Sequence, residues 1–123
     1  MSGQGTLYRE DGSILYQGEF SEGLISNGQE YYSNGAVKYK GQFADGAYSG
    51  RGKQYYPDGQ LHYEGVFYEG LFSEKGRLFT PGGKLLYQGY FYKGLYHDEG
   101  ILFAANGEVL HAGEFNHGEL VVD

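Results

Sequence analysis

One short pattern, Tyr-x-Gly-x-Phe, recurs along the whole chain and divides it into equal units. Its copies are Tyr16-Gly18-Phe20, Tyr39-Gly41-Phe43, Tyr63-Gly65-Phe67, Tyr87-Gly89-Phe91 and, with histidine replacing the tyrosine, His111-Gly113-Phe115. The phenylalanines are separated by one interval of 23 residues and three of 24 residues. A constant period of this length is typical of repeat proteins. The chain is therefore predicted to be an array of five similar units.

Other glycines recur at fixed places within each unit, so the pattern covers nearly the whole chain. We expect one domain over residues 1–123, with repeats at approximately 5–27, 28–51, 52–75, 76–99 and 100–123. Twenty of the 23 glycines of this chain follow the period, and this distinguishes them from the irregular glycine of disordered segments.

Composition excludes several classes of protein. The chain has no cysteine, which excludes disulfide scaffolds, thiol catalysis and Cys-ligated zinc. No apolar run approaches the length of a membrane span, and Met1-Ser2-Gly3-Gln4 lacks the features of a signal peptide, so we expect a cytoplasmic protein or a domain of a larger one. With a net charge of −7 and only nine lysines and arginines, scattered along the sequence, we expect neither nucleic acid nor membrane lipid as a ligand.

The turn signals predict short strands joined by tight loops. In Tyr56-Pro57-Asp58-Gly59, proline, aspartate and glycine stand where a type I turn closed by a glycine bulge requires them. This loop pairs Tyr56 with Gln60 and Tyr55 with Leu61. Equivalent turns are expected at Gly12, Gly35, Gly83 and Gly107, and a second set at Glu22-Gly23, Asp45-Gly46, Glu69-Gly70, Lys93-Gly94 and His117-Gly118.

Alternation along the strands predicts which side chains share a face. Tyr55, Leu61, Tyr63, Gly65 and Phe67 are expected on one face, which repeats in every unit and forms an aromatic core. The opposite face is expected to be solvated. The fold class is therefore all-β, a single-layer twisted antiparallel meander of about ten short strands built from five 23–24-residue β-hairpin repeats.

These residues resemble MORN repeats, the membrane occupation and recognition nexus motif. The resemblance rests on Tyr-x-Gly-x-Phe-x-x-Gly followed by Asp/Asn-Gly-x-Leu/Ile/Val-x-Tyr, and it covers Gly5 through Gly118. Tyr-Tyr-x-Asn/Asp-Gly, at residues 31–35 and 55–59, is similar to the bacterial, antitoxin-like branch. The resemblance implies a groove-bearing sheet that binds other proteins. Lipid binding has also been proposed for the family, and the acidic balance of this chain argues against it here.

We find no pattern that predicts catalysis, a cofactor or a metal site. The four histidines lack ligand spacing, and His97-Asp98-Glu99 is interpreted as a solvated junction. Gly50-Arg51-Gly52 lacks the further residues of nucleotide-binding loops. The chain is therefore not expected to be an enzyme.

Tyrosines outside the shared pattern are the candidate partner-binding residues, because exposed tyrosines on a rigid sheet provide large contact area at low entropic cost. They are Tyr32, Tyr56, Tyr68, Tyr90 and Tyr92. The alternative interpretation is that they cover neighbouring strands of a thin sheet.

We expect a non-catalytic protein-protein interaction scaffold, with an antitoxin-like or immunity-like role towards a basic target as the narrower hypothesis. The alternatives are a carbohydrate- or choline-binding repeat module, which the absence of tryptophan disfavours, and an accessory domain of a larger enzyme. The apolar ending Glu119-Leu120-Val121-Val122-Asp123 predicts either self-association through terminal strands or continuation of the natural protein beyond this sequence.

Overall fold

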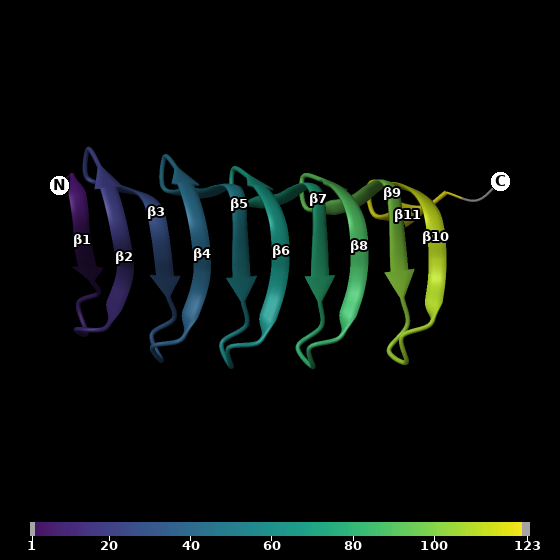
Figure 1. Ribbon diagram of the computed structural model, residues 1–123, viewed down its shortest axis with the longest axis horizontal. Helices are drawn as coiled ribbons and strands as arrows, with labels where there is room; N and C mark the ends of the chain where they lie inside the picture. Colours follow the sequence, from purple (N-terminus) through teal and green to yellow (C-terminus); the bar gives the residue numbers. More distant parts are fainter. Residues whose placement is uncertain (1, 122–123) are drawn as a thin grey trace.

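The computed structural model describes residues 2–121, which form one antiparallel sheet. Eleven strands are bonded in the order of the sequence, and β1 and β10 lie towards opposite ends of the row in Figure 1. The strands are β1 (Gly3–Tyr8), β2 (Ile14–Ser21), β3 (Leu24–Tyr31), β4 (Val37–Ala44), β5 (Ala47–Tyr55), β6 (Leu61–Tyr68), β7 (Leu71–Phe79), β8 (Leu85–Tyr92), β9 (Leu95–Phe103), β10 (Val109–Asn116) and β11 (Glu119–Leu120). The predicted all-β meander of hairpin repeats is confirmed.

The predicted turns are also confirmed. The Gly59 amide donates to the Tyr56 carbonyl oxygen at 2.9 Å, and the Tyr56 amide donates to the Gln60 carbonyl oxygen at 2.8 Å. The Asp58 carboxylate accepts the amide of Gln60 at 3.0 Å, which fixes the loop from within. At the other edge of the sheet, Glu69 and Gly70 both have positive φ, 51° and 84°, as a two-residue type I′ turn requires.

A β-bulge corrects the predicted assignment of faces. Tyr55 does pair with Leu61, but the next pair is Gln54 with Tyr63, so His62 is an extra residue in β6. Because paired residues share a face and successive residues alternate, Tyr55 and Leu61 lie on the face opposite Tyr63. The prediction that they share its face was therefore wrong, and so was the same prediction for the equivalent residues of the other repeats. These are Tyr8, Tyr31, Phe79 and Phe103, with Ile14, Val37, Leu85 and Val109.

We call the face that carries Tyr63 and Phe67 the aromatic face. The ring of Tyr63, which is 0% exposed, stacks on Phe72 with centroids 4.0 Å apart, and the edges of Phe67 and Phe91 meet it at 5.0 and 5.4 Å. Tyr39 with Tyr48, and Tyr87 with Tyr96, repeat this stack. The result is a continuous ladder of rings along the array, whose edge-to-face and stacked contacts add to the stabilisation from burial.

A row of paired glycines makes room for this ladder. Gly65 lies opposite Gly76, and a Cβ at Gly65 would lie 2.7 Å from the Gly76 Cα and 2.7 Å from the Lys75 carbonyl oxygen. A Cβ at Gly76 would collide with the ring of Tyr63. The aromatic rings therefore lie directly on backbone that has no side chain.

The change of period from 23 to 24 residues has a structural cause. Strands β5, β7 and β9 each have one residue more than β3. The extra residue forms a bulge in which Gly50, Glu74 and Asp98 have φ values of 67°, 51° and 55°. Bulges redirect the neighbouring side chains, and here they precede Arg51, Lys75 and Glu99.

Candidate functional site

The face opposite the aromatic face contains a groove of about 850 Å³ that crosses β4 to β8. We call this surface the groove face. The groove is lined by side chains from all five strands together with the glycine row. The charged side chains among them are Lys40, Arg51, Lys53, Glu64, Glu74, Lys75 and Arg77. Tyr55, Val66, Gln88 and Tyr90 complete the lining.

The charge of this groove is opposite to that of the whole chain. Five of the nine lysines and arginines line it, but only two of the sixteen aspartates and glutamates. The whole chain has a net charge of −7. The basic residues, which are scattered in the sequence, are thus gathered in space.

The centre of the groove is a row of ion pairs. Lys53, Glu64 and Arg77 lie opposite one another on β5, β6 and β7. Glu64 accepts a hydrogen bond from Arg77, and its other oxygen lies 3.5 Å from the Lys53 nitrogen. The hydrogen bond from Arg77 is the main reason that the pKa of the Glu64 carboxyl lies below its ordinary value. This carboxylate stays ionised and holds two of the five cations in place.

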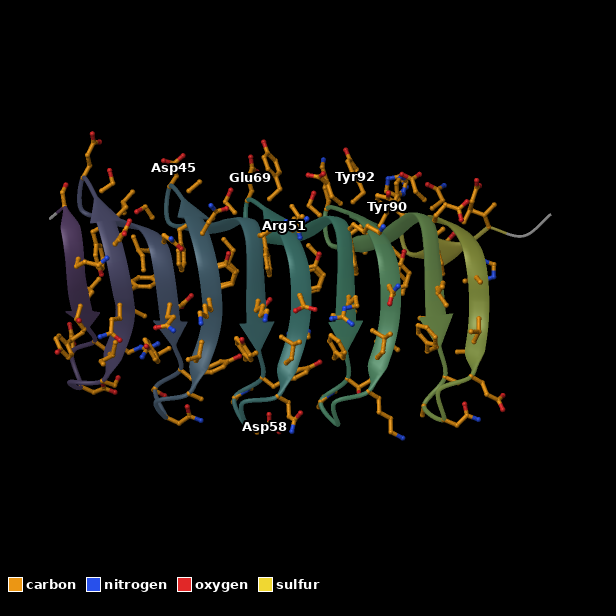
Figure 2. All side chains as sticks on the ribbon, viewed as in Figure 1. Asp45, Arg51, Asp58, Glu69, Tyr90 and Tyr92 are labelled. Carbon is orange, nitrogen blue, oxygen red and sulfur yellow. The ribbon has the colours of Figure 1, made fainter. Side chains whose placement is uncertain are left out.

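The upper part of the groove combines charge with apolar surface. Arg51 lies opposite Val66, and Lys75 lies opposite Tyr90. Figure 2 shows Arg51 and Tyr90 on the upper half of the strands, well away from the turn that carries Asp58. Each cation of this row is therefore paired with an apolar or aromatic side chain, and both project from the same face.

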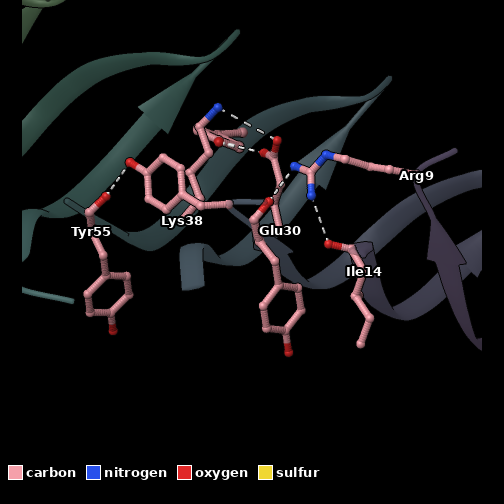
Figure 3. Close-up of polar contacts among 8 residues, drawn as sticks. Arg9, Ile14, Glu30, Lys38 and Tyr55 are labelled. Atoms are coloured by element: carbon pink, nitrogen blue, oxygen red, sulfur yellow. Dashed lines mark hydrogen bonds and ion pairs between the residues drawn. The ribbon is translucent and has the colours of Figure 1, made fainter. Parts of the chain in front are cut away.

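Two of the predicted tyrosines connect repeats. The Tyr32 hydroxyl donates to the Tyr55 carbonyl oxygen at 2.7 Å, as Figure 3 shows, and the Tyr56 hydroxyl donates to the Phe79 carbonyl oxygen at 2.8 Å. In the first repeat Arg9 has the same position and donates to the Tyr31 carbonyl oxygen at 2.5 Å. The hydroxyls of Tyr32 and Tyr56 are thus bonded within the molecule, and a role for these residues in binding a partner stays a prediction.

The other three predicted tyrosines lie on two surfaces. Tyr90 belongs to the groove. Tyr68 and Tyr92 lie at the upper turn edge, 65% and 46% exposed, where with Leu71 and Phe72 they line a second hollow of about 300 Å³. The five predicted tyrosines therefore lie in three places. Tyr32 and Tyr56 bond one repeat to the next, Tyr90 lines the groove, and Tyr68 and Tyr92 lie at a turn edge.

Comparison with protein families shows what kind of array this is. The model of the MORN repeat matches residues 1–14, 16–37, 39–61, 63–84 and 87–109. The chain belongs to the MORN-repeat family. MORN repeats are in general non-enzymatic modules that interact with proteins or membranes. A comparison with curated proteins gave no match.

Two histidines of this MORN-repeat chain lie close together. His97 and His117 lie with ring centroids 4.9 Å apart beside Tyr92. However, residues 2–121 contain no group of three or more histidine, aspartate or glutamate side chains that could hold a metal ion. Over the same residues, no helix is long and apolar enough to cross a membrane.

Proposed function

We propose that this MORN-repeat chain is a non-catalytic scaffold that binds another protein through its groove face. The observation that carries the proposal is the groove over β4 to β8, in which five cations stand beside Tyr55, Val66 and Tyr90. Tyrosine and arginine are enriched at protein interfaces, where they provide contact area and directed hydrogen bonds.

The support beneath the groove also favours binding. Each of the strands β4 to β8 is bonded to a neighbour on both sides, and the ring ladder packs against their other face. The backbone that carries the groove side chains is therefore already ordered before a partner arrives, which lowers the entropic cost of association. A rigid surface of this kind suits a scaffold.

Site-specific photo-cross-linking in the source cell tests the proposal. A photoreactive residue replaces Tyr90 in the groove or, as the control, Asp58 at the lower turn edge, where Figure 2 places it far from Tyr90. We expect a protein cross-linked from position 90 and absent from position 58, and we expect the same protein, once purified, to bind the chain. Cross-linking from position 58 alone, or no binding between the two purified proteins, would contradict the proposal.

The narrower form of this proposal is an antitoxin-like or immunity-like role. Outside the groove lining the chain has only four lysines and arginines against fourteen aspartates and glutamates, which favours a basic target for its outer surfaces. Co-expression with the cross-linked partner tests it. The partner alone should arrest growth, and the chain should restore it; a partner that is harmless alone counts against this role.

A further inference from the structure

We propose that the groove binds a short, extended, acidic segment of the partner protein. Its carboxylates would meet Lys40, Arg51 and Lys75, and its apolar side chains would meet Val66 and Tyr90. This inference rests on the proposed function, since it names the kind of segment that the scaffold binds.

Part of the positive charge in the groove is not compensated by carboxylates. Lys53 and Arg77 are already paired with Glu64. Within residues 2–121, Lys40, Arg51 and Lys75 have no ion pair, and Lys40 lies directly opposite Lys53 across β4 and β5. Like charges directly opposite each other destabilise a sheet. A carboxylate that enters the groove would therefore relieve a repulsion that the fold itself leaves in place.

The positive region is short, because carboxylates flank it on the groove face. Glu19 lies on β2, and Glu99 and Glu114 lie directly opposite each other on β9 and β10; all three are exposed. The groove between them crosses the five strands β4 to β8, which are about 4.8 Å apart, so it is about 19 Å long, the length of about six extended residues. A long nucleic acid or a membrane surface would meet the flanking carboxylates, whereas a short acidic segment would not.

The side chains of the upper groove form a regular pattern. Arg51 is paired with Val66, and Lys75 with Tyr90, so charge and apolar surface alternate across the strands. Arg51 and Lys75 lie two strand spacings, about 9.6 Å, apart, which is close to the rise of three extended residues. An extended peptide of the polyproline II type, which has three residues per turn, offers the complementary pattern when an acidic residue recurs at every third position and apolar residues lie between. A uniform polyanion offers only the charge, and it would also be repelled by Glu64 and Glu74, which lie within the groove.

A labelled peptide measures this preference directly. The probe is a fluorescein-labelled peptide of about six residues, Glu-Val-Val-Glu-Val-Val, which spans the groove. Its controls replace glutamate with lysine or valine with serine. By fluorescence anisotropy we expect the Glu-Val peptide to bind most tightly, to bind more weakly as salt is added, and to lose binding when glutamate is replaced.

Two double variants with equal change of charge test the site. Lys40→Glu/Lys75→Glu alters the groove, and Lys84→Glu/Lys93→Glu alters lysines outside its lining. Each new glutamate already occurs at the same position of another repeat, namely Glu64, Glu99, Glu108 and Glu22, so all four changes suit the fold. We expect the groove variant to weaken peptide binding about tenfold or more and the control variant by less than about twofold.

Several outcomes would overturn the inference. They are failure of the Glu-Val peptide to bind, equal loss in the two double variants, or tighter binding of a single-stranded oligonucleotide or of phosphatidylserine vesicles. If the cross-linked protein binds the chain and Lys40→Glu/Lys75→Glu leaves that binding unchanged, the acidic segment is refuted while the scaffold function stands. If the peptide behaves as expected and no protein partner is found, it is the scaffold function that fails.

Discussion

The hydroxyl of Tyr56 donates a hydrogen bond to the carbonyl oxygen of Phe79 at 2.8 Å and so connects one repeat to the backbone of the next. The two residues are 23 positions apart, almost one period. Tyr32 makes the same contact with Tyr55, and Arg9 makes it with Tyr31. These side chains add bonds between repeats to those of the sheet ladder.

We predict that Tyr32→Phe and Tyr56→Phe each lower the free energy of unfolding by about 1 kcal/mol, because each removes one partly buried hydrogen bond and keeps the ring. Tyr68→Phe is the matched control, since its side chain is 65% exposed, and its effect should stay within about 0.5 kcal/mol. Urea unfolding of the three variants is the measurement. An equal loss in all three would show that the inter-repeat bonds do not stabilise the array.

We predict that Gly65→Val is far more damaging than Gln60→Val. The new Cβ at position 65 would lie 2.7 Å from the Cα of Gly76, and the backbone of the facing strand cannot move without displacing the ring ladder. Overpacking of this kind costs about 1–3 kcal/mol or more, whereas a change at exposed Gln60 should stay within about 0.5 kcal/mol. Thermal unfolding compares the two variants, and similar losses of melting temperature would contradict the packing described for the glycine row.

We predict a loss of stability in alkaline solution. Burial raises the pKa of Tyr39 and Tyr87 to about 12, above the value of about 10 for tyrosine in an unfolded chain. The folded state therefore holds these protons more tightly, so their contribution is complete below pH about 10 and is lost as the pH rises to about 12. The urea midpoint, measured across this interval, should fall, and it should fall less in a Tyr39→Phe/Tyr87→Phe variant. A midpoint that does not change up to pH about 12 would refute the assignment.

Self-association through the terminal strands stays a prediction, and the structure suggests its register. Among residues 2–121, β1 pairs only with β2, and β11 covers β10 only at Phe115 and Asn116. Gly5 has the repeat position of Gly100, which lies opposite Gly89, so β1 of a second copy would place Gly5 opposite Gly113. Light scattering of the 123-residue chain should detect this species. Val121→Lys should weaken it, because charge on an edge strand opposes pairing. A strict monomer at high concentration would contradict the prediction.

The strand order, both sets of turns and the core role of Tyr63 and Phe67 could be predicted from the sequence, because each depends on a local pattern that repeats. The bulge at His62 could not. Its position holds Leu15, Lys38, His62, Leu86 and Leu110 in successive repeats, and such different residues give no signal of an inserted position. The three-residue turn has the same conformation with or without the bulge. It therefore does not reveal on which face the side chains that follow the bulge lie.

The charged lining of the groove was missed for a different reason. Lys40, Lys53, Glu64 and Arg77 are far apart in the sequence, but each is the immediate neighbour of a glycine in the central row. Alignment of the strands on these glycines would have placed the four charged residues in one line across the sheet. The stacked rings of Tyr48, Phe72 and Tyr96 carry a similar signal, since each follows a turn glycine by two residues.

The arrangement of the strands in one row also determines how the molecule responds to tension. The strands run across the long axis of the row in Figure 1, and their hydrogen bonds run along it. A pull between β1 and β10 acts parallel to those bonds and loads the ladders in series, so that every ladder bears the same force and the weakest one separates first. Each hairpin that separates releases the length of chain contained in about one repeat. Under force the array therefore extends in steps of equal length.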